Sequence, residues 1–142
     1  MNVDILRIGP GDAAVLERVA EDVFDDAIDP ARVAAYLAEP NHLMVLAVSA
    51  GEVVGQARGI VHRHPDLPTE LYIDNLGVTP ARKREGIATR LLDELVRWGR
   101  ENGCEEAWVG TEPDNEPARA LYEARGSEAE TFVLYFYAFD DT

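Results

Sequence analysis

The residues with the most distinctive chemistry form a short basic stretch in an acidic chain. The chain of 142 residues has 13 Lys and Arg against 27 Asp and Glu, a formal net charge of −14. Residues 82–90 nevertheless carry a local charge of +3, four basic residues minus one acidic: Arg82, Lys83, Arg84, Arg90 and Glu85. Gly86 and Ala88 keep bulk away from the backbone at the start of an expected helix, where free amides and the helix dipole favour anions. The stretch predicts a phosphate or pyrophosphate site.

The acidity of the rest of the chain limits the partners that are expected. Such a surface repels nucleic-acid phosphates and anionic lipid, so neither nucleic acid nor membrane is expected as a partner. It attracts cations, but it is equally typical of a salt-adapted source. No apolar run approaches the ~20 residues that span a bilayer, and no basic-then-apolar leader is found. With a single cysteine, Cys104, no internal disulfide can form, and a reducing cytoplasm is the expected location.

Two further groups of reactive residue types are not assigned chemistry. His62, His64 and Asp66 form an H-x-H-x-D pattern. They lie in a proline-bearing loop without further ligands close in sequence, so no metal is expected. Cys104 has no basic neighbour in sequence that would lower its pKa, and it is not expected to act as a nucleophile.

The elements that must position the basic stretch alternate between strand and helix periodicity. Strands are predicted over 3–8, 43–49, 52–61, 70–78, 106–111 and 130–139. Helices are predicted after Asp12, with an apolar stripe from Leu16 to Phe24, and over 31–38, 87–102 and 115–125. Trp98 and Trp108 are expected in the core. This order predicts one domain over 1–142, a mixed α/β sheet flanked by helices.

Two motifs carry a resemblance to a known family. The run Lys83-Arg84-Glu85-Gly86-Ile87-Ala88 resembles the [QR]-x-x-G-x-[GA] pyrophosphate loop of the GNAT superfamily of N-acetyltransferases, which bind acetyl-coenzyme A. Residues 115–126 resemble its second signature, N-x-x-A-x-x-L-Y-x-x-x-G. More closely, 71–78, 85–89 and 112–126 resemble the small aminoglycoside 3-N-acetyltransferases of subclass I. The resemblance implies the α/β (α+β) GNAT fold, a mixed, mostly antiparallel sheet of six to seven strands with about four helices. It is also compatible with a homodimer.

The resemblance implies how acetyl-coenzyme A would be held. Backbone groups of Leu76, Gly77 and Val78 would bind the pantetheine arm as though it were an added strand. The pyrophosphate loop would consist of Lys83, Arg84, Glu85, Gly86, Ile87, Ala88 and Thr89. Lys83 replaces the usual Gln or Arg, which should matter little because the contacts are mostly main-chain. Asn115 would contact the pantetheine or simply cap the last helix.

The resemblance also implies direct attack of an amine on the thioester in a ternary complex. Tyr122, protonated at neutral pH, would give a proton to the departing thiolate. The base is left open among Asp74, water held by Asn75, and Glu112. Strand alternation places Asp74 and Asn75 on opposite faces, so at most one of them faces the amine. The family's carboxylate falls at position 75, where this chain has Asn, and this departure weakens the aminoglycoside inference.

The acceptor is expected to be a small cationic amine. Four aspartates gather where the first two helices should meet, as a solvated acidic face or as a rim that binds the amine: Asp22, Asp25, Asp26 and Asp29. Asp26, Asn75 and Glu112 are the substrate-binding candidates. The predicted reaction is N-acetylation, with the 3-amino group of an aminoglycoside as the acceptor that the resemblance implies. The alternatives are a peptide, protein or other small amine, or a non-catalytic acyl-coenzyme A-binding module.

Overall fold

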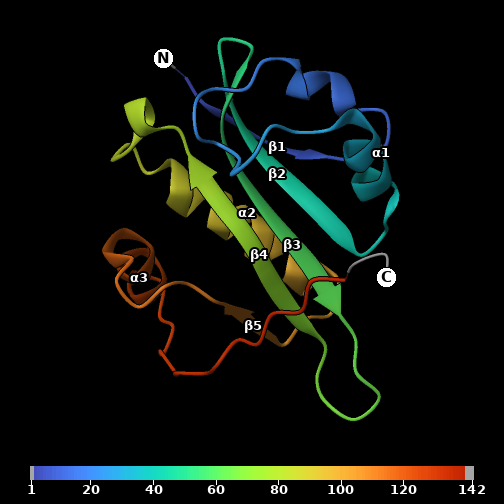
Figure 1. Cartoon of the computed structure of the whole chain (residues 1–142), viewed down its shortest axis with the longest axis vertical. Coiled ribbons are helices and arrows are strands. Elements are labelled where there is room, and N and C mark those ends of the chain that lie inside the picture. Colours follow the sequence, from blue (N-terminus) through green and yellow to red (C-terminus); the bar gives the residue numbers. More distant parts are fainter. Residues whose placement is uncertain (1, 140–142) are drawn as a thin grey trace. The chain divides into compact units, whose positions relative to one another are not determined.

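The computed structural model describes residues 2–139, which fall into two compact units, one ending at Gly110 and one starting at Thr111. Each unit is described by itself. The first contains β1 (Asp4–Ile8), the 3-10 helix η1 (Ala13–Glu17), α1 (Pro30–Ala38), β2 (His42–Ser49), β3 (Glu52–His62), β4 (Glu70–Val78), the 3-10 helix η2 (Pro80–Arg82), α2 (Ile87–Glu101) and β5 (Glu106–Val109) (Figure 1). The second contains α3 (Glu116–Ala124). No helix in the described part of the chain is both long and apolar enough to cross a membrane.

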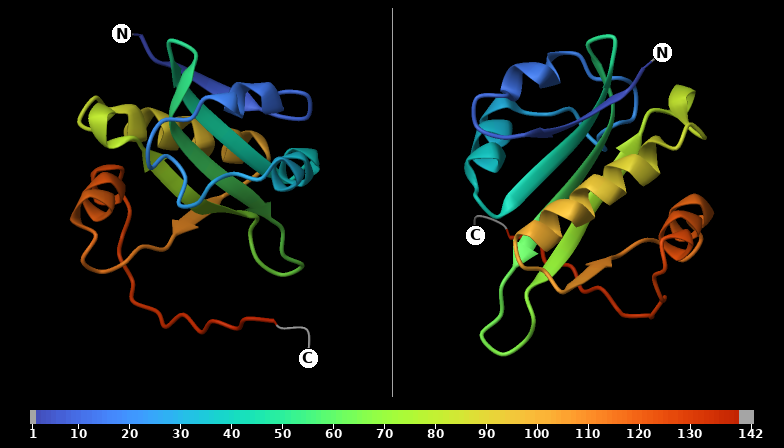
Figure 2. Two further views of the ribbon diagram at one scale, coloured as in Figure 1. Left: turned by 45° about the horizontal axis from the view of Figure 1, so that its top comes forward. Right: turned by 180° about the vertical axis from the view of Figure 1, so that it is seen from behind.

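The first unit is built on a sheet with the strand order β1-β2-β3-β4-β5. All neighbours are antiparallel except β4 and β5, which are parallel. Ala50 (φ 52°) and Gly51 (φ 77°) join β2 to β3 with two left-handed residues, the backbone that a two-residue hairpin requires. α2 covers one face of the sheet, and η1 and α1 lie on the other (Figure 2). This hairpin and the order of the elements around it were predicted from the sequence.

The packing of α2 fixes where its N-terminus lies relative to the sheet. Its buried side chains recur at helical spacing: Ile87, Leu91, Leu92, Leu95 and Trp98. A Cβ on Gly59 would lie 2.9 Å from Leu95, and one on Gly99 would lie 3.0 Å from Leu71. The helix therefore sits too close to the sheet for larger residues at these two glycines. At the start of α2, a Cβ on Gly55 would lie 3.3 Å from both Ile87 and the carbonyl of Gly77, so the first turn of the helix packs closely beside the end of β4.

The sheet has five strands, and the described residues form three α-helices, rather than the six to seven strands and four helices that were predicted. The helix expected after Asp12 is the first difference, since only the short η1 forms. The carbonyl of Arg18 and the amide of Ala20 both bond to Val53, so this part of the chain pairs with β3 instead of winding into a helix. The Asp12 carboxylate accepts a hydrogen bond from the Gly9 amide rather than capping a helix.

The strand predicted over 130–139 is the second difference. Residues 127–139 contain no strand, and α3 is the one regular helix or strand of the described second unit. The large apolar side chains of this segment are exposed: Phe132, Val133, Leu134, Tyr135, Phe136, Tyr137 and Phe139. A strand needs a neighbour for its backbone hydrogen bonds. The apolar pattern predicted the strand but could not supply its neighbour.

Candidate functional site

The turn before α2 presents main-chain amides. Arg84 (φ 70°) and Gly86 (φ 78°) are both left-handed, and Gly86 is the N-cap of the helix. Glycine has no side chain that could cap the first amides of the helix. The first helical bond runs from the Arg90 amide to the Gly86 carbonyl, so the amides of the preceding turn have no helical acceptor. A helix start of this kind suits an anion such as a pyrophosphate.

The charges around this turn are partly paired. Arg82 Nε lies 2.8 Å from Glu85 Oε2, and this hydrogen bond raises the pKa of Arg82 and lowers the pKa of Glu85. The side chains of Lys83 and Arg84 are exposed. The positive charge of the turn beyond the Arg82–Glu85 pair therefore comes from Lys83, Arg84 and Arg90.

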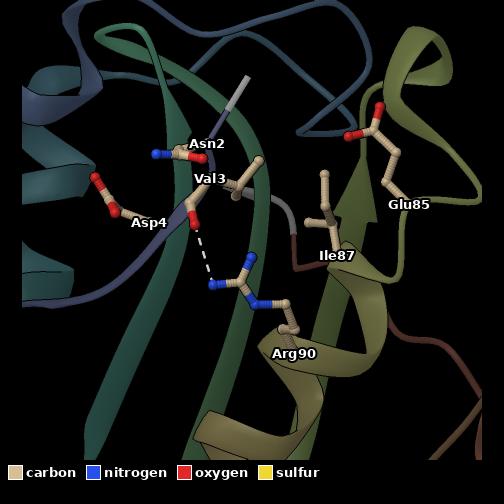
Figure 3. Close-up of a pocket in the computed structure, with 6 residues that line it drawn as sticks. All are labelled: Asn2, Val3, Asp4, Glu85, Ile87 and Arg90. Carbon is tan, nitrogen blue, oxygen red and sulfur yellow. Dashed lines mark hydrogen bonds between the residues drawn. The ribbon is translucent and has the colours of Figure 1, made fainter.

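A pocket of about 450 Å³ lies beside the turn, between the start of β1 and the first turn of α2 (Figure 3). Arg90 Nη2 donates to the carbonyl of Val3 at 3.0 Å across it. Asp4 and Glu85 also line the pocket, so its walls carry both signs of charge. The pocket alone does not select an anion, and the case for an anion rests on the amides of the turn.

The second half of β4 has an unpaired edge beside the turn that precedes α2. β5 pairs with β4 only from Glu70 to Ile73. From Asn75 to Val78, β4 keeps its pairing with β3 but has no neighbour on its other side among the described residues. Leu76 and Val78 lie on this stretch, and the chain continues from Val78 through Thr79 into η2. The sheet thus offers a length of unpaired strand edge next to the amide-rich turn.

The β3–β4 pairing contains a bulge at Asp74. Arg58 on β3 pairs with Asn75, while the next residue of β3, Gly59, pairs with Ile73. Asp74 is therefore the extra residue of the bulge, and strand alternation is interrupted there. Asp74 acts electrostatically on Tyr36 of α1, and Asn75 contacts Asp25 and Gln56 next to Val23, which packs in the same cluster as α1, so both side chains lie on the face that carries α1. The prediction that they point to opposite faces is wrong.

Asn75 is held in a network of side-chain amides. The fully buried Gln56 donates through Nε2 to Asn75 Oδ1 at 2.6 Å and to the carbonyl of Val23 at 3.2 Å. Asn75 Nδ2 donates to Asp25 Oδ2 at 3.4 Å. A Cβ on Gly77 would lie only 2.5 Å from the Val23 carbonyl oxygen, so glycine is needed there. These contacts seat the segment that carries the aspartates against β4.

Asp74 lies among aromatic side chains on the same face. It is exposed, and its charge adds to burial in raising the pKa of both Tyr36 and Tyr72. Burial is the larger cause for each phenol, and Arg58 opposes the shift at Tyr36. Asp74 thus presents a carboxylate to solvent beside two phenols that stay protonated at neutral pH.

An aromatic pair continues this face onto β5. Tyr72 stacks on Trp108 with ring centroids 4.5 Å apart and planes inclined by 30°. Trp108 is 43% exposed, so the prediction that it lies in the core is wrong, whereas Trp98 is buried as predicted. The reason is position: β5 is the edge strand, and no element of the first unit covers this end of it. The pair forms an aromatic surface next to the carboxylate of Asp74.

The second unit carries the remaining candidates. Asn115 caps α3, its Oδ1 accepting from the Ala118 amide at 3.2 Å. Tyr122 is partly buried, and this burial raises the pKa of its phenol. Glu112 is exposed, and its carbonyl accepts from the Asn115 amide. Three predicted residues therefore belong to one helix and the turn before it.

The acidic segment contains one contact that the sequence analysis did not single out. Asp26, the predicted substrate-binding residue, is exposed. It is the neighbouring Asp25 whose carboxylate reaches Asn75. Gln56 was also missed, because a lone Gln inside an apolar strand carries no motif. A buried amide in the middle of a strand was the available signal, since buried polar side chains normally have a partner.

Comparison with known proteins decides the family. The sequence pattern of the acetyltransferase (GNAT) family matches residues 14–126, which include the amide-rich turn, the β4 bulge and α3. The chain belongs to the GNAT family. GNAT acetyltransferases use acetyl-coenzyme A, and the protein is an acyltransferase.

Its relatives within the GNAT family act on different amines. Aminoglycoside N(6')-acetyltransferase type 1 of Salmonella typhimurium is 26% identical over 104 residues, 69% of this chain and 71% of that protein. N-alpha-acetyltransferase RimI of Mycobacterium tuberculosis is 38% identical over 104 residues, 73% of this chain and 63% of that protein. The structure of an aminoglycoside acetyltransferase from an uncultured soil metagenomic sample superposes with a TM-score of 0.82 at 25% identity, covering 98% of this chain and 100% of that one. The resemblance is thus to aminoglycoside acetyltransferases, including 6'-N enzymes, and the narrower 3-N subclass stays a prediction.

Proposed function

We propose that this GNAT acetyltransferase transfers the acetyl group of acetyl-coenzyme A to a primary amine of an aminoglycoside, by direct attack in a ternary complex. The observation that carries the proposal is the β4 bulge, which puts Asp74 and the Asn75–Asp25 pair on one face. The unpaired β4 edge follows this bulge along the strand. A cationic acceptor and an anionic cofactor would thus meet along a single strand.

The cofactor would lie along the second half of β4 and over the turn. The unpaired edge at Leu76, Gly77 and Val78 would bind the amides of the pantetheine arm, as a neighbouring strand would. The amides from Arg84 to Thr89 would bind the pyrophosphate, with Lys83 supplying charge. Asn115 is committed to capping α3 through its Oδ1, which leaves its Nδ2 group for the pantetheine.

The acceptor would be recognised by negatively charged side chains and by an aromatic surface. Asp74 and Asp25 are exposed carboxylates, and an ammonium group interacts favourably with both. The stacked Tyr72 and Trp108 offer an aromatic surface to the apolar face of a sugar ring. Asp26 and Glu112 would contribute charge at the rim.

The proton transfers need a base and an acid. Asp74 would remove the proton from the ammonium group, and the free amine would attack the thioester carbonyl carbon. As the C–S bond breaks, Tyr122 would protonate the thiolate sulfur, and the second proton that the nitrogen loses as the amide forms would return through solvent to the Tyr122 phenolate. Asn75 is occupied by Gln56 and Asp25, so it would position the acceptor rather than hold a catalytic water.

Tyr122→Phe tests the proposed acid. Removal of the phenol should lower kcat about 100-fold, a typical contribution of a general acid, with little change in either KM. A phenol donates only below its pKa, and burial raises that pKa above the ordinary ~10. The wild-type kcat should therefore stay flat up to at least about pH 10 before it falls. Full kcat in Tyr122→Phe would remove Tyr122 from the mechanism.

A peptide α-amine is the second candidate acceptor, favoured by the 38% identity to an N-alpha-acetyltransferase. A thiol-release assay over aminoglycosides, polyamines and peptides with free N-termini separates the two. Turnover of aminoglycosides above the peptides supports the proposal, and NMR of the product then assigns the 3-amino or the 6'-amino group. Preferred turnover of peptides, or coenzyme A binding without turnover of any amine, would overturn it.

A further inference from the structure

The base of the β3–β4 hairpin brings together three potential metal ligands. His62 ends β3 and is the cross-strand partner of Glu70, which begins β4. Glu70 Oε1 lies 3.3 Å from His62 Nδ1 and 3.2 Å from His64 Nε2. The ligand atoms of all three residues lie within 4.8 Å of one another. The third member is Glu70, not the Asp66 of the sequence pattern, because the hairpin register rather than sequence spacing selects it.

The geometry at His64 leaves its buried ring nitrogen available to an ion. His64 Nε2 is buried and makes no hydrogen bond to any described residue, although the Glu70 oxygen is only 3.2 Å away. Atoms that bind one ion point at a common centre instead of at each other. With Zn–N and Zn–O distances of about 2.0–2.1 Å, the edges of a tetrahedral site are about 3.3 Å long. The separations of Glu70 Oε1 from His62 Nδ1 and from His64 Nε2 match such edges.

Backbone hydrogen bonds anchor the loop between β3 and β4 at both ends. At the start of the loop, the Val61 amide donates to the Asn41 carbonyl at 2.9 Å. At its end, the Glu105 amide donates to the Thr69 carbonyl at 2.9 Å. The Arg63 guanidinium is turned toward the Asn102 carbonyl, at 3.4 Å. The loop that carries the histidines is thus anchored at both ends, in a chain whose charge of −14 attracts cations.

We propose that His62, His64 and Glu70 bind one divalent transition-metal ion of the Zn²⁺ type. Two imidazoles and one carboxylate supply three ligands, and water would take the fourth position on the side of His62, whose side chain is 56% exposed. Glu70 is four residues before Asp74, about 13 Å along an extended strand. The ion would therefore clamp the β3–β4 loop and take no part in acetyl transfer.

Zinc and cobalt binding to the full chain test this site. The background is Cys104→Ser, which removes the one thiol, and excess Mg²⁺ occupies the acidic surface. Calorimetry should give one Zn²⁺ per chain with a Kd of about 1 μM or tighter, and Co²⁺ should give the visible absorption of a tetrahedral N/O site. Zn²⁺ should also raise the Tm of the protein.

The chain contains three histidines, which provides a matched control. His64→Ala and Glu70→Gln should each weaken Zn²⁺ binding at least about 10-fold, while His42→Ala, outside the cluster, should bind as the parent does. Circular dichroism of the metal-free variants verifies that each is folded. Absence of saturable binding in the parent, or equal affinity of His64→Ala and the parent, would overturn the site.

Discussion

The turn before α2 and the bulge of β4 lie on either side of Val78 along the chain, but one presents backbone groups and the other presents side chains. The turn presents backbone amides, and the side chains of Lys83 and Arg84 are exposed around them. The bulge presents side chains, with Asn75 fixed by Gln56 and Asp25. A main-chain site tolerates changes of side chain but not of backbone. A side-chain site depends on the chemical groups themselves, so substitutions should separate the two.

Gly86→Glu should have the largest effect and acts on the turn alone. It places a carboxylate at the proposed pyrophosphate site and a side chain at φ 78°, where glycine is favoured. The affinity for coenzyme A should fall more than about 100-fold, because like charges repel in the site and the amides are displaced. Calorimetric titration with coenzyme A measures this.

Gly86→Ala is the matched control for the charge. A Cβ at this position has no atom within 4 Å, so only the left-handed backbone is penalised, by about 1–2 kcal/mol. This variant should bind coenzyme A within about 30-fold of the wild type, since each 1.4 kcal/mol corresponds to a factor of ten. Unchanged affinity in Gly86→Glu would contradict the assignment of the turn.

Asp74→Asn should have the next largest effect and acts on the bulge. Loss of the carboxylate should lower kcat/KM for the acceptor about 10- to 100-fold, while the KM for acetyl-coenzyme A stays the same. Steady-state kinetics with each substrate varied in turn measure both.

Asp66→Asn is the control, since it removes an exposed carboxylate from the β3–β4 loop without touching the bulge. It should leave kcat/KM within about twofold of the wild type, as expected of an exposed residue outside the site. If Asp66→Asn and Asp74→Asn had equal effects, the overall negative charge of the surface rather than a specific base would explain the kinetics.

The same contrast explains what the sequence could predict. The hairpin at Ala50-Gly51, the apolar stripe of α2 and the turn at Gly86 are local signals, and the structure contains each of them. The orientation of Asp74 depends on the pairing of β3 with β4, and a one-residue bulge reverses the result of simple alternation. Glu70 meets the two histidines for the same reason. Spacing along one segment carries no information on the register between two strands.

The first predicted helix failed for a related reason. Its apolar stripe was real, since Leu16 and Val23 are buried. The backbone between them instead pairs with Val53, and Asp22 takes a positive φ of 59°. The burial of these side chains was thus predictable from their pattern, while the backbone that buries them was decided by a distant strand.

Gly77→Ala should have a smaller effect and tests whether the two regions are mechanically linked. The new methyl would lie 2.5 Å from the Val23 carbonyl oxygen. Because this oxygen belongs to the backbone, the clash is relieved only if the chain around Val23 moves. Stability should fall by about 1–3 kcal/mol as the segment carrying Asp25 is pushed away from β4. The KM for the acceptor should rise with it. Urea denaturation and acceptor kinetics measure the two effects.

Gly9→Ala is the control, because a Cβ at Gly9 meets no atom within 4 Å. It should change stability by no more than about 0.5 kcal/mol. If Gly77→Ala raised only the KM for acetyl-coenzyme A, the contact between Gly77 and Val23 would have no influence on acceptor binding.

Lys83→Gln should have the smallest effect and is the sharpest test of the main-chain interpretation. It restores the family's usual Gln at a position where the side chain is exposed, and exposed charges contribute little at ordinary salt. The KM for acetyl-coenzyme A should change by no more than about threefold at moderate ionic strength, and by less at high salt as the remaining charge effect is screened. A salt-independent rise of about tenfold or more would show that the Lys83 side chain binds the cofactor directly. In that case the turn and the bulge would both be side-chain sites, and the distinction between them would fail.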